Sequence, residues 1–418
     1  IYLISFLPLA LAAGPAVIET VVILIISLFF FSKKKIKLDK IDKLIFIFYL
    51  FLILSSAFSS FVVESLSSSI FLIRFILLYL ILRYYFFSEY KLKIINLTFV
   101  ILCITFIILI IDGYTQYFLK FSIFGTELNT SERMIMHFRK DEFIMGSYLS
   151  KMMPIFLGYW YLKFKNFNFN TNFFLTLLII LSFYCMVLSN DRAATFLMIA
   201  LFIGLTILYK SKIYYKFFVL LTIVFSIFIT ITVFPSVKER YIDTTLKEIL
   251  GKNDHRVLED ITILRDSDKK AKFFNFKINE KNIYYFSTAH EAHVKTAINM
   301  FIHNPFFGIG PNNFRKLCSE NNYGIYEERG CSTHPHNILS QILAETGIIG
   351  LFFYLIPLFY LIIKLIKQVF SPNLNFNLLI IYSFYFLLLM PFFPSGNIFN
   401  NWYIYSIALP FLFLKFIK

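Results

Sequence analysis

The chain has 418 residues, of which 58% are apolar and 20% aromatic, and its mean hydropathy is +0.71. Soluble domains are about 45–50% apolar, so this composition excludes a water-soluble globular protein. Only 14 Gly, 12 Pro and 4 Cys are present, which excludes a collagen-like or disordered chain and a small disulfide scaffold. The net charge of +15 would suit nucleic acid, but in an apolar chain the basic residues must first be assigned to the two sides of a membrane.

Apolar stretches long enough to cross a bilayer follow one another along the chain. The first nine end at residue 235, and the other three follow a long polar segment. The sequence therefore predicts an all-α polytopic membrane protein with about 12 transmembrane helices. The predicted spans are residues 1–13, 15–32, 43–59, 67–87, 94–111, 143–162, 172–189, 193–209, 217–235, 347–366, 377–393 and 401–416.

The Lys and Arg residues of the short connections predict the orientation of these helices. One alternating set of connections and ends carries 18 basic residues and the opposite set only five, so the first set is expected in the cytoplasm. Residues 236–336 then lie on the outer side, where their 15 basic and 13 acidic residues nearly balance. Membrane topology thus accounts for most of the positive charge, and no binding to nucleic acid is expected.

This threading divides the chain into three regions. Residues 1–235 form an N-terminal transmembrane region of about nine spans. Residues 236–336 form one large periplasmic loop, which we expect to be mostly helical and packed on the membrane helices. Residues 337–418 form a C-terminal transmembrane region of about three spans.

All seven histidines lie in segments assigned to the outer side. The pKa of histidine suits proton transfer near neutral pH, although polar residues also gather in long loops without such a role. The pairs His290–His293 and His334–His336 could also suit a metal, but no Cys-x-x-Cys or His-Glu-x-x-His pattern accompanies them, so we expect no metal site. The seven are His137, His255, His290, His293, His303, His334 and His336.

The sharpest motif follows the outer loop, where His336 and Asn337 precede nine residues and then Gly347-x-x-Gly350. His336 and Gly347 are eleven residues apart, close to three helical turns. A continuous helix would therefore place them on one face, with small residues between them. Such a face lets a lipid-linked substrate or another helix approach closely, so a substrate site and a plain packing face both fit the pattern.

The His-Asn and Gly-x-x-Gly pattern resembles the signature of the O-antigen ligase and polymerase superfamily, which joins lipid-linked glycans to acceptors on the outer side of the bacterial inner membrane. Residues 304–314 are similar to the family's Pro-x-x-Gly-x-Gly-x-x-x-Phe stretch. Weaker similarities lie at residues 112–117, 141–150 and 189–193, in the family's order. The resemblance covers most of the chain.

The resemblance implies a ligase-type glycosyltransferase that moves a glycan from undecaprenyl pyrophosphate to a hydroxyl of a lipid-anchored acceptor, the lipid A-core of lipopolysaccharide. It implies a metal-independent, inverting reaction without a cofactor, in a multi-pass protein of the bacterial inner membrane with a periplasmic active site. The donor, the acceptor and membrane lipids are the expected partners. A polymerase of lipid-linked repeat units shares the motif, and a membrane transporter would have a similar number of helices.

Two residues are expected to carry this chemistry. His336 suits the base that takes the proton of the acceptor hydroxyl. Arg192, at the outer end of a span, suits the pyrophosphate because its planar donors match phosphate oxygens, whereas an anchoring pair with Asp191 is the structural alternative. The further substrate-binding candidates are Arg139, Glu142, Arg74, Asn337, His334, Gly347 and Gly350.

Two of the four cysteines, Cys318 and Cys331, lie in the outer loop, whereas Cys103 and Cys185 lie in predicted spans. Thiols in an oxidising periplasm tend to pair. We therefore predict a Cys318–Cys331 disulfide just before the His336 motif, where closing the loop would contribute about 3 kcal/mol in the chain-entropy model.

Overall fold

The computed structural model describes residues 1–125, 133–136, 143–163, 166, 168–250, 277–278, 281–282, 287–320, 323, 330–391 and 393–415. These residues are mainly helical, with a small antiparallel hairpin of two-residue strands, β1 (Lys277–Ile278) and β2 (Lys281–Asn282). The predicted all-α class is therefore confirmed.

A helix occupies each predicted span, and the span predicted at 67–87 is shared by two helices with a break at residues 71–72. The helices are α1 (Tyr2–Ala13), α2 (Pro15–Phe31), α3 (Lys40–Ala57), α4 (Val62–Ile70), α5 (Ile73–Phe86), α6 (Lys91–Leu119), α7 (Met145–Lys163), α8 (Phe169–Leu188), α9 (Arg192–Leu208), α10 (Ile213–Val233), α16 (Ile338–Phe370), α17 (Phe376–Leu389) and α18 (Asn401–Lys415).

Within the described residues, five helical stretches are long and apolar enough to cross a membrane. Four shorter helices, α1, α2, α9 and α17, are also apolar. The number of twelve crossings stays a prediction. The five stretches are Val62–Phe86, Lys91–Leu119, Phe169–Leu188, Ile213–Val233 and Ile338–Phe370.

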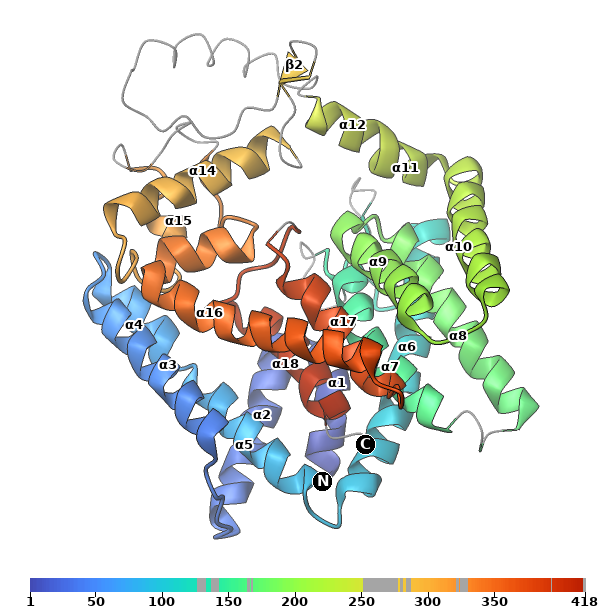
Figure 1. Ribbon diagram of the computed structural model, residues 1–418, viewed down its shortest axis with the longest axis horizontal. Helices are drawn as coiled ribbons and strands as arrows, with labels where there is room; N and C mark the ends of the chain where they lie inside the picture. The colour runs from blue at the N-terminus through green and yellow to red at the C-terminus, as the bar shows by residue number, and fades with distance from the viewer. Residues whose placement is uncertain are drawn as a thin grey trace.

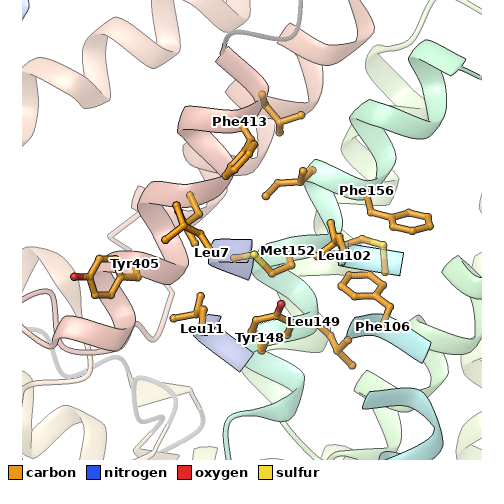
Figure 2. Close-up of a cluster of buried hydrophobic side chains, with 14 of the residues drawn as sticks. Leu7, Leu11, Leu102, Phe106, Tyr148, Leu149, Met152, Phe156, Tyr405 and Phe413 are labelled. Carbon is orange, nitrogen blue, oxygen red and sulfur yellow. The ribbon is translucent and has the colours of Figure 1, made fainter. Parts of the chain in front are cut away.

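The buried core lies where α1, α6, α7 and α18 meet (Figure 2). Met152 is fully buried among these helices. Two hydrogen bonds fix α1 to its neighbours, because the Tyr148 hydroxyl donates to the Pro8 carbonyl at 2.7 Å and Trp402 Nε1 donates to the Leu11 carbonyl at 3.1 Å. Pro8 lies inside α1. The two bonds satisfy polar groups that would otherwise be buried in the apolar core without a hydrogen-bond partner.

Helix α10 stands at the edge of the bundle, at the right of Figure 1, and almost none of its surface is buried by the protein. Among its side chains, Phe217 is 67% exposed, Phe228 62% and Phe225 60%. An exposed apolar face of this length would favour aggregation in water, but it is the surface expected of a helix that faces lipid.

Short helices of the segment 236–336 lie over one end of the bundle, at the top of Figure 1. Helices make up much of the described part of this segment, and the predicted structure of the whole segment stays a prediction. Ser287 caps the longest of these helices by accepting a hydrogen bond from the His290 amide, so the first turn begins at a defined residue. The elements are α11 (Pro235–Lys238), η2 (Glu239–Asp243), α12 (Thr244–Ile249), α14 (Thr288–His303) and α15 (Phe314–Leu317).

Residues 305–310 pair with α16 at a kink in that helix. The Ile309 amide donates to the Ala344 carbonyl at 2.9 Å, and the Ile348 amide donates to the Pro305 carbonyl at 2.8 Å. The kink is at Gly347, whose φ of 65° is unfavourable for other residues. A Cβ on Gly347 would lie 2.4 Å from the Phe306 oxygen, so only glycine allows this approach.

The predicted continuous helix from His336 to Gly347 is therefore wrong. Helix α16 begins at Ile338, and His336 lies before it with a left-handed φ of 54°. Asn337 ends the turn as the N-cap, because its side chain accepts the Ser340 amide at 3.0 Å. The small residues that follow receive the 305–310 loop, so in this structure they form a packing face.

Candidate functional site

The turn that carries His334 and His336 is held by the segment before α18. The Ser395 amide donates to the His336 carbonyl at 2.9 Å, and the His334 ring forms a 3.1 Å hydrogen bond with the Ser395 carbonyl. Asn337 Nδ2 donates to the Pro391 carbonyl. These bonds fix the backbone of the turn and the His334 ring. The His336 ring forms its own 3.1 Å hydrogen bond, between Nε2 and the Ser332 hydroxyl.

Four imidazole rings meet at this turn. His290 and His293 lie one helical turn apart on α14, with ring centroids 6.3 Å apart. The His336 ring centroid lies 5.4 Å from that of His290, 5.5 Å from that of His293 and 4.1 Å from that of His334. We call these four residues the histidine cluster. Sequence analysis identified His334 and His336 but assigned no role to His290 and His293.

Burial makes the histidine cluster uncharged at neutral pH. Burial, followed by the neighbouring rings, lowers the pKa of His336 to about 3. The pKa of His334 falls to about 4, mainly through burial. Burial also lowers the pKa of His290 and of His293. Each ring therefore keeps a lone pair that can accept a proton or a hydrogen bond.

Acid is expected to destabilise the fold through His334 and His336. Both have a pKa near 6.5 when unfolded and a lower pKa when folded, so the unfolded chain binds more protons below pH 6.5. Their contribution to stability is complete above that pH and is lost as the pH falls toward 4 and 3. We expect the unfolding temperature to drop between about pH 7 and pH 5, and to drop less in a His334→Gln, His336→Asn double variant. An equal drop in both proteins would assign the effect to other groups.

Arg192 begins α9 and binds α12. Its guanidinium donates to Thr245 Oγ1 and to Glu248 Oε2, both at 2.8 Å, from α12. Asp191 is not its ion-pair partner, because the Asp191 side chain accepts the Ala194 amide at 3.2 Å as the N-cap of α9. The anchoring pair with Asp191 is therefore replaced by a pair with Glu248, in which both side chains are about one quarter exposed.

Two further arginines lie near Arg192. Burial, and then the positive charges of Arg192 and Arg133, lowers the pKa of Arg240. The Nε atoms of Arg133 and Arg240 are buried and have no hydrogen-bond partner among the described residues. Among the described carboxylates, Glu248 partly offsets these charges. We call Arg133, Arg192 and Arg240 the arginine cluster; its excess charge and unused donors suit an anion.

The two clusters adjoin. Glu248 raises the pKa of His290 and Arg192 lowers it, after the larger effects of burial and His293. Arg192 and Glu248 therefore lie within electrostatic range of His290. An anion bound by Arg192 would act on the same ring.

Sequence analysis missed Arg133 and Arg240, but one of its weak motifs explains the position of Arg133. Gln116 donates to the Ile135 carbonyl at 3.0 Å and accepts the Ile135 amide at 3.0 Å. Asp112 in turn accepts Gln116 Nε2 at 2.7 Å. The motif at residues 112–117 thus holds the segment that follows Arg133, whereas no local pattern marks Arg240.

The other predicted site residues lie apart or outside the described chain. Arg74 forms hydrogen-bonded ion-pair contacts of 2.8 and 2.9 Å with Glu19, which also accepts the Tyr405 hydroxyl at 3.2 Å. A charged side chain among apolar helices needs a partner. Glu19 supplies that partner to Arg74, so no substrate is needed to balance this charge. Gly350 lies against Thr346 of its own helix. Arg139 and Glu142 fall outside the described residues.

The structure joins Cys318 and Cys331 in a disulfide, with their Cα atoms 5.0 Å apart. The bond links α15 to the segment immediately before the histidine turn. Cys318 is buried with Phe314 and Ala344 in a small apolar cluster, so the bond also fixes that cluster to the turn.

Removal of this disulfide is expected to lower stability. The bond closes a loop with a sequence separation of 13 residues. In the chain-entropy model, a Cys318→Ser, Cys331→Ser variant should lose about 3 kcal/mol of unfolding free energy. Thermal unfolding in detergent would measure the loss, with Cys103→Ser as the control for removal of an unpaired thiol. A loss of equal size in the control would contradict the prediction.

Residues 177–355 match the family model described as O-antigen ligase. The match confirms the resemblance to the O-antigen ligase and polymerase superfamily. It includes the whole histidine cluster, Arg192 and Arg240, but not Arg133. No curated protein matches the chain. The family and the apolar helices together indicate an integral membrane protein, and the family is one of glycosyltransferase-like enzymes that use lipid-linked glycans.

Proposed function

We propose that this protein is an O-antigen ligase-type glycosyltransferase of the bacterial inner membrane, with its active site on the periplasmic side. It would move a glycan from undecaprenyl pyrophosphate to a hydroxyl of the lipid A-core. The observation that carries the proposal is the adjacency of an uncharged histidine cluster and an arginine cluster with unused donors. The first suits proton removal from a hydroxyl, and the second suits a pyrophosphate.

In the proposed reaction, the acceptor hydroxyl attacks the anomeric carbon of the donor glycan. The oxygen–hydrogen bond breaks and its proton passes to His336, while the bond from the anomeric carbon to the pyrophosphate oxygen breaks with inversion. The arginine cluster meets the negative charge that develops on the pyrophosphate. Arg139 and Glu142 stay candidates for donor binding. The resemblance implies that this displacement proceeds without a metal or cofactor.

The proposal predicts the lipopolysaccharide of a strain that lacks the protein. Long lipid-linked polymer and bare lipid A-core should accumulate, and expression of the wild-type chain should restore the capped core. Core capped by a single repeat unit would instead establish a polymerase that joins lipid-linked repeat units. Purified protein in liposomes with donor and acceptor should transfer the glycan, and a failure to transfer with unchanged lipopolysaccharide in the strain would overturn both glycan-transfer functions.

A further inference from the structure

The Nδ1 atom of His293 is a hydrogen-bond acceptor for which no described residue is a donor. The side chain of His293 is 9% exposed, and its Nδ1 atom is buried without a hydrogen-bond partner. The backbone of Cys331 interacts with the ring, so the ring N–H is directed toward that carbonyl and Nδ1 carries the lone pair. A buried acceptor without a partner is costly, which indicates that it is used in another state of the site.

His336 lacks a group that would stabilise its charged form. None of the described carboxylates contacts its ring, and the groups that act on its pKa are burial and the rings of His334, His290 and His293. Glu248, the carboxylate that acts on His290, is bound to Arg192. The Ser332 hydroxyl oxygen lies 3.1 Å from Nε2 of His336. A neutral imidazole lone pair is then the acceptor that remains for the other ring nitrogen of an imidazolium at His336.

The charged and titratable groups around these rings come from five elements. Beyond the four histidines of α14 and the turn, they are Arg192 of α9 and Glu248 of α12, which act on His290, and Arg315 of α15, which acts on His334. Glu291 and Lys295 of α14 form an ion pair with each other. None of these groups supplies His336 with a negative charge of its own.

We infer that His293 is a positioning residue for the transfer reaction, whose Nδ1 accepts a hydrogen bond from the imidazolium that forms at His336. The inference rests on the proposed function. The proton leaves the acceptor oxygen, binds His336, and is shared with His293 Nδ1 before it passes to water. The 5.5 Å between the two ring centroids allows this contact after a small ring rotation or through one water.

Two substitutions separate this role from a structural one. His293→Leu keeps an apolar side chain in the buried site but removes the acceptor, whereas His293→Gln keeps an amide oxygen that can accept. His303 lies on the same helix with an exposed side chain outside the cluster, so His303→Leu is the matched control. Transfer rates in liposomes are measured for each variant across the pH range.

We expect His293→Leu to lower kcat by about 10- to 100-fold, a part of the full effect of a general base, with little change in the KM for the donor. His293→Gln should recover most of the rate, and His303→Leu should match the wild type. Equal losses in the Leu and Gln variants would overturn the role of His293.

The same experiment separates this inference from the proposed function. If His336→Asn abolishes transfer while His293→Leu retains the wild-type rate and pH profile, the proposed function stands and the role of His293 is wrong. If His336→Asn itself retains the wild-type rate, the assigned base is wrong, and the role of His293 falls with it.

Discussion

Replacement of His336 by Ala should lower glycan transfer by about 10²- to 10⁴-fold, the usual effect of removing a general base. The abundance of the inserted protein should change little, because the turn is held through the backbone carbonyl of His336, which accepts the Ser395 amide and is kept in the variant. The lone pair that would take the proton is lost with the ring. His334 is not expected to replace it, because the His334 ring is bound to the Ser395 backbone carbonyl, whereas the His336 ring is bonded to the Ser332 hydroxyl.

A second variant controls for the backbone of this turn. His336 has a φ of 54°, a conformation that costs Ala more than Asn. His336→Asn therefore preserves the turn while it removes the imidazole, and it should lose as much activity as His336→Ala. Transfer in liposomes measures both variants against His303→Ala. Activity of His336→Asn within a few-fold of the wild type would show that the lost activity of His336→Ala comes from the turn and not from a base.

Sequence patterns predicted the positions of the apolar helices well because each depends on a local run of apolar residues. All predicted spans contain helices, and α10 shows the clearest case, since an exposed apolar helix needs no tertiary partner to be recognised. The helix from His336 to Gly347 failed for a tertiary reason. The spacing is helical, but Gly347 bends toward the 305–310 loop and the Asn337 cap excludes His336 from the helix.

The site was predicted only in part, because its residues come from segments distant in sequence. His336 and Arg192 were identified from a motif and from a position at a helix end. His290 and His293 carried a visible signal, the i, i+3 spacing that places two rings on one helix face, but nothing local showed that this face meets His336. No sequence pattern marks Arg240, which follows α10. Its role is inferred from its position near Arg192.

Replacement of Arg192 by Lys is expected to lower transfer by about 10²-fold, comparable to the loss of one donor to a developing oxyanion. Lys keeps the charge, but it loses the planar pair of donors that fits a phosphate. In the described state Arg192 is bound to Thr245 and Glu248, so pyrophosphate must compete with Glu248 for the same guanidinium. Transfer per molecule of inserted protein is the quantity to measure, at several donor concentrations.

Glu248→Gln separates the two roles of this arginine. If Arg192 binds pyrophosphate, removal of its carboxylate partner frees the guanidinium and removes a nearby negative charge, so the KM for the donor should fall or stay unchanged. If Arg192 only anchors α9 to α12, Glu248→Gln removes this ion pair and Arg192→Lys weakens it. The pair is partly exposed and therefore worth at most about 1 kcal/mol. Both variants would then lower abundance, and each inserted molecule would keep normal activity. A selective loss of transfer in Arg192→Lys, with Glu248→Gln active, is the result that the pyrophosphate role requires.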